Sequence, residues 1–201
     1  MSKKHFSIDV ESADVIGRGS MLSFGATVIG DYSKTFYREL KPLDLFPNYN
    51  TQAMKIASLG LECLKEKTSE EYDPKSNNFK PNLVLKLLEE VGTDPKEAME
   101  DFRDWVNKES EGYSPVLWSA PIKYDGGFMS LYHGLTNVQD PFGHSGSDIA
   151  SFYKGNKSDL SAKYQRSIKI KREGIHHNGL DDAITQGKKL EAILRKNNID
   201  V

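Results

Sequence analysis

Three β-rich segments near the start of the chain, joined by short links, constrain its fold more than any other feature. Residues 5–11 alternate between apolar and polar side chains, and residues 20–29 form a second β-rich run. Gly30-Asp31 supplies a turn into a third run at residues 34–41. Because consecutive strands with short links pair side by side, we expect an antiparallel meander of three strands.

The rest of the chain alternates helical patterns with one further strand. Asp94-Pro95 is a helix start, with an N-cap residue followed by proline at the first helical position. Ser114–Ser119 predicts a fourth, buried strand, residues 68–80 are typical of an exposed loop, and residues 140–172 support no assignment. These patterns predict one α/β domain over residues 1–201, with a mixed sheet and flanking helices. The expected helices are 52–67, 82–91, the segment after Pro95, a segment from about Tyr124 to about His133, and a last one from just after His177 to about Asn197.

Composition excludes several classes of protein. Of the 201 residues 37% are hydrophobic and 28% are charged, which excludes a wholly disordered chain. Apolar runs stay well short of the roughly 20 residues that span a bilayer, so we expect no membrane partner. The basic start lacks the apolar stretch of a signal peptide, and the one cysteine, Cys63, excludes an internal disulfide and a thiolate zinc cluster. These features predict a cytoplasmic protein of a reducing compartment.

Charge is unevenly distributed along the chain. The net charge of −2 argues against a protein that coats nucleic acid by bulk charge. Residues 62–111 carry fourteen acids and eight bases, whereas residues 151–172 carry seven bases and one acid. The basic run is either a solvated surface or, if it lies beside an active site, a contact for a polyanion. Its position in the fold has to decide between the two.

Acidic residues at three places carry the chemistry. Asp9 and Glu11 leave the same face of the first predicted strand, although the same pattern fits an exposed edge strand. Asp125 begins a helix, where an acid also stabilises the helix dipole. His177 and Asp182 lie at the start of the last helix, where they also fit a capping cluster with a surface histidine. His144 and Asp148, four residues apart, are compatible with one helical turn and are interpreted as structural.

Taken together, the acids point to metal-dependent phosphodiester hydrolysis. That reaction needs an activated water and stabilisation of charge on the attacking and leaving oxygens, which two divalent ions supply. Hard divalent ions prefer several carboxylates converging from different elements, as these residues would provide. A histidine beside the last acid would act as general base.

These motifs resemble those of a known family. Phe6-Ser-Ile-Asp-Val-Glu11, Tyr124-Asp125 after a central strand, and the run from His177 through Asp182 to Gln186 are similar to the motifs of the DEDDh, or DnaQ-like, 3′–5′ exonucleases. The resemblance spans residues 6–190 and implies a ribonuclease H-like fold. The segment from Ser20 to Ala26 is most similar to small stand-alone phage and bacterial members, including exoribonuclease-like ones.

The resemblance also implies roles for particular residues. Asp9, Glu11, Asp125 and Asp182 would hold two Mg²⁺ or Mn²⁺ ions, with Asp9 bridging both, and His177 would orient or deprotonate the attacking water. Asp181 and His176 would be neighbours of the site. Further candidates for substrate binding are Met21, Leu22 and Phe128 at the last base, where each is alternatively a core residue, and Lys163, Arg166 and Lys169 at the phosphates.

The expected substrate is the 3′ end of single-stranded or 3′-overhanging nucleic acid, with RNA ahead of DNA and nucleoside 5′-monophosphates as products. Many relatives form dimers, so a homodimer is one expected state, in a bacterial or phage-infected cell. Two alternatives stay open at this point: an inactive ribonuclease H-like binding or scaffold protein, and a metal-dependent phosphatase of small phosphates.

Overall fold

A five-stranded sheet organises residues 3–199, the part of the chain that this computed structural model describes. The first three strands pair antiparallel, as the meander predicted, and the fourth and fifth run parallel to the first. The strand order is β3-β2-β1-β4-β5, which places the strand carrying Asp9 and Glu11 at the centre of the sheet. The strands are β1 Lys3–Ser12, β2 Met21–Val28, β3 Asp31–Glu39, β4 Ser114–Ser119 and β5 Gly146–Asp148.

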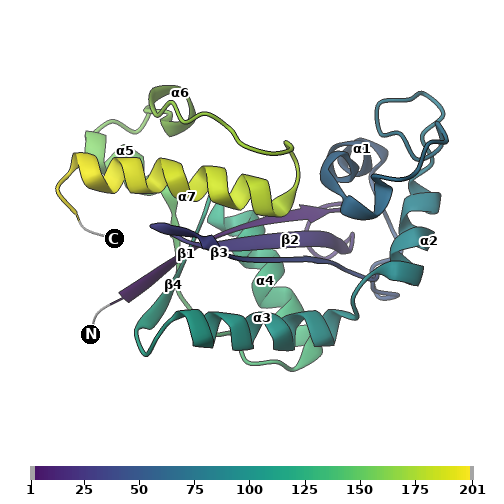
Figure 1. Cartoon of the computed structure of the whole chain (residues 1–201), viewed down its shortest axis with the longest axis horizontal. Helices are drawn as coiled ribbons and strands as arrows, with labels where there is room; N and C mark the ends of the chain where they lie inside the picture. The colour runs from purple at the N-terminus through teal and green to yellow at the C-terminus, as the bar shows by residue number, and fades with distance from the viewer. Residues whose placement is uncertain (1–2, 200–201) are drawn as a thin grey trace.

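Helices cover both faces of this sheet (Figure 1). The last helix lies along one face with α5 and α6, α3 and α4 cover the other face, and α1 and α2 lie at one end. The helices are α1 Thr51–Ala57, α2 Pro81–Val91, α3 Pro95–Glu109, α4 Ile122–Thr136, α5 Ile149–Lys157, α6 Tyr164–Ser167 and α7 Gly179–Lys196, with two 3₁₀ turns, η1 Ser58–Gly60 and η2 Glu62–Leu64.

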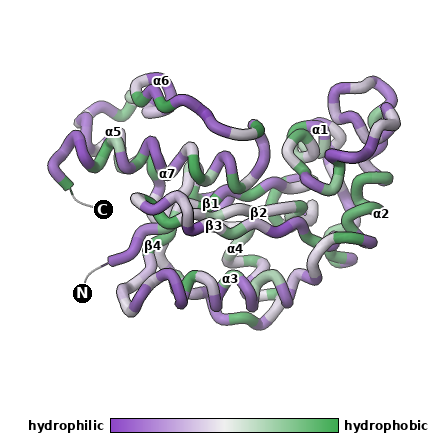
Figure 2. Tube along the Cα trace, viewed as in Figure 1, coloured by the Kyte–Doolittle hydropathy of each residue, from purple (hydrophilic) through white to green (hydrophobic). Residues whose placement is uncertain are grey.

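Apolar side chains fill the space between these layers. The main core joins the sheet to α3 and α4 and contains an aromatic cluster around Phe102. A second cluster joins Trp118 on β4 to α5, α6 and α7, and a third lies under α1 and α2. Figure 2 shows the same arrangement, with hydrophobic residues on the strands and a hydrophilic segment running from α6 toward α7. Within residues 3–199, no helix is long and apolar enough to cross a membrane.

Two local predictions were wrong. The helix expected over 52–67 ends at Ala57 and continues as η1 and η2, because the carboxylate of Glu39 accepts the backbone N–H groups of Glu62 and Cys63. His144 and Asp148 do not share a helical turn. Asp148 ends β5 and caps α5, accepting the N–H of Ser151 at 2.6 Å. The strand β5 itself was missed because Gly-Ser-Asp carries no apolar alternation.

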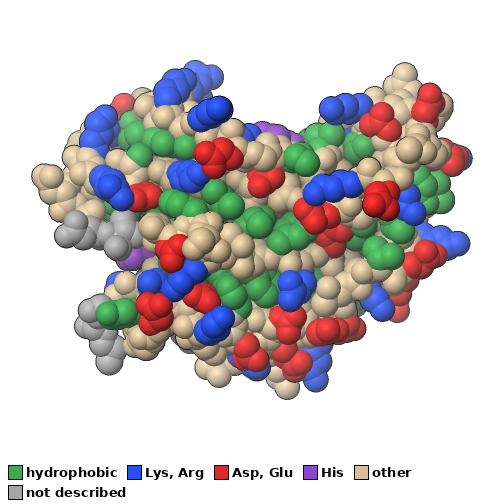
Figure 3. Space-filling view, viewed as in Figure 1, with side chains coloured by type: hydrophobic (Ala, Val, Ile, Leu, Met, Phe, Trp, Pro, Cys, Tyr) green, Lys and Arg blue, Asp and Glu red, His purple; other side chains and the backbone are tan. Residues whose placement is uncertain are grey.

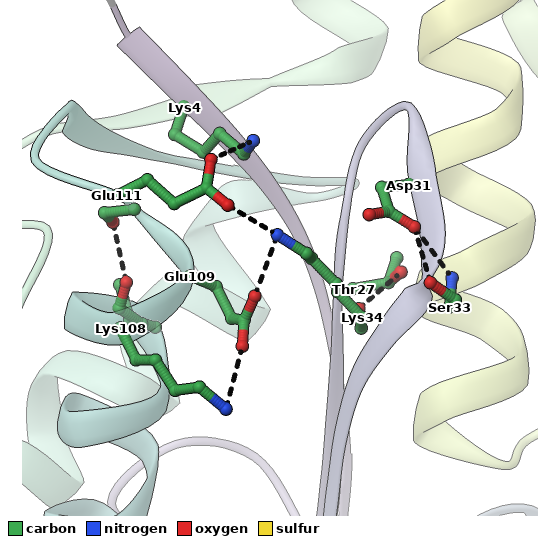
Figure 4. A network of polar contacts seen from close by, with 10 residues as sticks. Lys4, Thr27, Asp31, Ser33, Lys34, Lys108, Glu109 and Glu111 are labelled. Carbon is green, nitrogen blue, oxygen red and sulfur yellow. Dashed lines mark hydrogen bonds and ion pairs between the residues drawn. The ribbon is translucent and has the colours of Figure 1, made fainter.

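An ion-pair network ties the outer strand of the meander to the end of α3 (Figure 4). The Nζ of Lys34 lies 2.8 Å from Glu111 and 3.1 Å from Glu109, and Lys4 on β1 reaches Glu111 at 3.4 Å. These side chains are partly exposed, so solvent screens each pair and its contribution to stability is small. The network lies on the sheet, away from the acids of the predicted site, and has a structural role.

Candidate active site

The structure brings together the acids that the sequence singled out. Asp9 and Glu11 extend from β1, Asp125 lies in the first turn of α4, and Asp182 lies in the first turn of α7. Carboxylate oxygens of Asp9, Glu11 and Asp182 all lie within 4.8 Å of one another. Asp125 lies next to this group, because its Oδ1 accepts the backbone N–H of Val10, the residue between Asp9 and Glu11, at 3.2 Å.

Glycines allow the start of α7 to approach the sheet closely enough for this cluster to form. A Cβ on Gly25 of β2 would lie 2.2 Å from the nitrogen of Leu180, and one on Gly179 would lie 3.1 Å from the carbonyl oxygen of Asp9. Any side chain at Gly25 would therefore push α7 away from β1 and β2. This close contact places Asp182 beside the two acids of β1.

The backbone of His177 has an unusual conformation and packs closely against η1. Its φ of 65° is in the left-handed region, which is unusual for a residue other than glycine and occurs mainly at functional or strained sites. The next residue, Asn178, caps α7 and donates its Nδ2 to the carbonyl of Gly60 at 2.8 Å. A Cβ on Gly60 would lie 2.2 Å from the carbonyl oxygen of His177, so η1 supports this loop only with glycine there.

The imidazole of His177 faces the acids. Its Nδ1 lies 3.4 Å from Glu11 Oε1, and its backbone N–H donates to Asp182 Oδ2 at 2.9 Å. The contact with Glu11 raises the pKa of His177. The neighbouring His176 is exposed and stacks its ring edgewise on that of His177, although its nitrogen also comes within 4.8 Å of ligand atoms of His177 and Asp182.

Burial and mutual repulsion disfavour the ionised form of these carboxyl groups. Burial raises the pKa of Asp125 to about 7. The hydroxyl of Ser119 is a polar neighbour of the carboxylate, but Oδ2 has no partner at hydrogen-bond geometry within residues 3–199. Burial, then the charges of Asp125, Glu11 and Asp182, raises the pKa of Asp9 well above its usual range, and burial also raises that of Glu11. The four carboxylates repel one another, and one of them has a buried oxygen without a hydrogen bond to any described residue. Such a set of oxygen ligands suits hard divalent cations such as Mg²⁺ or Mn²⁺.

Two polar residues at the site had been noted in the sequence without a role of their own. Gln186 donates its Nε2 to Asp9 Oδ1 at 2.5 Å, and its position four residues after Asp182 on one helix face was the signal that could have identified it. Arg172 forms an ion pair with Asp182. Nothing local marked Arg172 among the seven bases of its segment, because only the fold turns it toward the acids.

The residues expected to contact the last base require a correction. Met21, Leu22 and Phe128 are each 0% exposed, since they pack in the core between the sheet and its helices and cannot present a stacking surface. Apolar side chains that do reach the surface include Val15 and Ile16 in the loop after β1, which are 54% and 37% exposed, and Ile175 before His177, which is 44% exposed. Ile16 packs against α4 at Gly127, two residues after Asp125.

The basic segment lies beside the acids. Lys163, Arg166 and Lys169 are exposed around α6, while Tyr164 between them is buried. Burial, with added contributions from acids that include Asp9 and Asp125, raises the pKa of Tyr164 to about 12. Figure 3 shows Lys and Arg side chains gathered over α6 and histidine side chains in the hollow between α6 and α1. The run therefore lies on the same side of the sheet as α7, which carries Asp182.

Asp181 points away from the cluster, as expected. Its Oδ2 accepts the N–H of Ile175 at 2.6 Å, and its carboxylate occupies the space that a Cβ on Gly174 would need. Asp181 therefore shapes the loop before α7, while the adjacent Asp182 faces the acids of β1.

Comparison with known proteins agrees with this geometry. A family model described as the 3′-5′ exoribonuclease Rv2179c-like domain matches residues 4–194. The curated 3′-5′ DNA exonuclease Cap18 of Escherichia coli is 32% identical over 168 residues, which cover 82% of this chain and 74% of the relative.

Solved structures share the fold. The nuclease domain of 3′hExo, a DEDDh family member bound to rAMP, aligns with a TM-score of 0.68 at 14% identity, over 96% of this chain and 92% of that one. Pop2p of S. pombe, in its Mg²⁺- and Mn²⁺-bound form, aligns with a TM-score of 0.60 at 13% identity, over 96% and 83% of the two chains. These likenesses confirm the predicted ribonuclease H-like fold.

Proposed function

Since the chain belongs to the 3′-5′ exoribonuclease Rv2179c-like family and is a 3′–5′ exonuclease of the DEDDh type, we propose that it removes nucleotides from single-stranded 3′ ends by a two-metal-ion reaction. The observation that carries this proposal is the convergence of acids from β1, α4 and α7, with His177, at one place in the fold. Products would be nucleoside 5′-monophosphates.

The four acids would hold the metal ions. Asp9, Glu11, Asp125 and Asp182 supply oxygen ligands from three elements, and their unfavourable proximity is relieved by bound positive charge. Two Mg²⁺ or Mn²⁺ ions bound there would activate a water and stabilise charge on the attacking and leaving oxygens. Gln186 would keep Asp9 in place through its hydrogen bond.

His177 would act as the general base. The hydrogen bond to Glu11, followed by the charges of Glu11 and Asp182, raises the pKa of His177, so the imidazole accepts a proton readily from a water beside the acids. Its strained backbone, held by Asn178 and Gly60, keeps the ring directed toward Glu11.

The exposed bases around α6 would guide the strand. Lys163, Arg166 and Lys169 supply phosphate contacts without sequence information, as an exonuclease with no sequence preference requires. Val15 and Ile16 would contact the terminal base in place of the buried residues first expected there. RNA is placed ahead of DNA because the family model is described as an exoribonuclease domain, although the E. coli relative is a DNA exonuclease. That the protein forms a homodimer stays a prediction, which a measurement of its molecular mass in solution would test.

A labelled-strand assay tests the function. Matched RNA and DNA oligonucleotides, labelled at the 5′ end, are incubated with the protein and Mn²⁺, and we expect a ladder that shortens from the 3′ end. His177→Ala should slow this by about 10²- to 10⁴-fold, the usual contribution of a general base. A mononucleotide in parallel separates the exonuclease from a small-phosphate phosphatase, and binding without shortening would identify an inactive binding protein.

Adjacent acids on α7 provide a matched control. Asp182→Asn should abolish shortening, whereas Asp181→Asn should retain it, because only Asp182 faces the acids of β1. No shortening by the wild-type protein would overturn the proposed function. Equal loss in both variants would overturn the assignment of Asp182.

A further inference from the structure

Arg172 is placed to do more than neutralise a neighbour. Within residues 3–199, Arg172 is the Lys or Arg residue that forms an ion pair with one of the four acids of the site. Its guanidinium contacts Oδ1 of Asp182. Its side chain is 32% exposed and that of Asp182 is 10% exposed, so the pair lies at the mouth of the site.

The guanidinium lies among the groups proposed to carry out the reaction. Its partner Asp182 also accepts the backbone N–H of His177 and has carboxylate oxygens within 4.8 Å of ligand atoms of Asp9 and of His176. The charge of Arg172 acts on Lys189 of α7, whose ammonium lies over the ring of Tyr164 on α6. Arg172 is the last base of the segment 151–172, so it connects the proposed path of the strand to the acids.

The guanidinium of Arg172 and a bound metal ion would compete for the carboxylate of Asp182. A divalent cation held by Asp182 would be repelled by a guanidinium on that carboxylate, because both carry positive charge at short range. A displaced guanidinium beside bound cations needs another anion, and its planar set of donors suits phosphate oxygens. A single-stranded 3′ end is the anion that the proposed function brings to this place.

We propose that Arg172 exchanges partners during the reaction cycle: it pairs with Asp182 before cations bind, and it then binds a phosphate of the strand at its 3′ end. The exchange makes strand binding and cation binding mutually supportive, since each removes Arg172 from Asp182. This inference rests on the proposed function and deepens it by naming a substrate-binding residue.

Two binding measurements with opposite expected signs test the exchange. Isothermal titration with Mn²⁺ alone should show that Arg172→Gln binds the metal about fivefold more tightly than wild type, the effect of removing a competing pair worth about 1 kcal/mol. Fluorescence anisotropy with a labelled single strand and Mn²⁺, in a His177→Ala background that slows hydrolysis, should show at least fivefold weaker strand binding.

Arg172→Lys and Lys169→Gln are the matched variants. Lysine keeps the charge but lacks the planar donor set, so Arg172→Lys should bind Mn²⁺ as wild type does and bind the strand more weakly. Lys169→Gln removes a charge from the same segment. Within residues 3–199, the ion pair to the acids comes from Arg172 and not from Lys169, so this variant should weaken strand binding and leave Mn²⁺ affinity unchanged.

The outcomes separate this inference from the function on which it rests. Weaker or unchanged Mn²⁺ binding by Arg172→Gln would show a merely structural tether and overturn the exchange. Unchanged strand binding by both Arg172 variants would also overturn it. Wild-type protein that fails to bind Mn²⁺, or Asp182→Asn protein that binds it as wild type does, would instead overturn the proposed metal site.

Discussion

Neutralising Asp125 should stabilise the metal-free protein while removing its activity. The carboxylate is 3% exposed, with one oxygen bonded to the N–H of Val10 and the other without a partner within residues 3–199. Asp125→Asn keeps the size of the side chain and an oxygen for Val10. It removes the charge that burial disfavours, so the gain in stability should appear where the wild-type group is ionised.

The magnitude follows from the raised pKa. Burial raises the pKa of Asp125 from 3.8 to about 7, so the folded protein binds the proton more tightly than the unfolded chain does. Stability therefore falls as pH rises from about 4 to about 7, by up to about 4 kcal/mol at 1.36 kcal/mol for each pH unit. At pH 5 the penalty is about 1–2 kcal/mol by the same conversion. Imperfect burial of the new amide offsets about 1 kcal/mol of the gain.

Urea denaturation with a chelator at pH 8 and at pH 5 measures this effect. We expect the Asn variant to be more stable by about 3 kcal/mol at pH 8, with a melting temperature higher by about 6–12 °C, and the difference to shrink at pH 5. Asp94→Asn, which exchanges one good helix cap for another on α3, should change little at either pH. An Asp125→Asn protein that is less stable at pH 8, or equally shifted at both pH values, would refute the reasoning.

Two further predictions concern packing. Phe128→Ala should destabilise the fold by about 3–5 kcal/mol in the same denaturation assay, because the ring is fully buried, and a loss of strand affinity without loss of stability would contradict its place in the core. Gly60→Ala should lower turnover more than it lowers strand affinity, since its Cβ would displace the backbone of His177. Unchanged turnover would show that η1 does not position that residue.

Local patterns in the sequence were sufficient for most of the elements. The meander, the strand Ser114–Ser119 and the helix capped by Asp94 follow from alternation, apolar spacing and capping within short windows. The helix over 52–67 was predicted wrongly because the turns after Ala57 depend on Glu39 of β3, which lies more than twenty residues before the N–H groups of Glu62 and Cys63 that it accepts. The pattern of acids and His177 identified the candidate site, because hard divalent ions prefer several carboxylate oxygens and a nearby histidine can act as a base.

Only the tertiary structure decided which residues meet. Gly25 and Gly179 bring α7 against β1 through backbone contacts that no local pattern encodes, and this approach joins Asp182 to Asp9. The same packing turned one of seven bases, Arg172, toward the acids. The sequence determined the types of group available and the elements that carry them. Their convergence depended on close packing between segments far apart in the chain, and the energy of such contacts cannot be assigned from either segment alone.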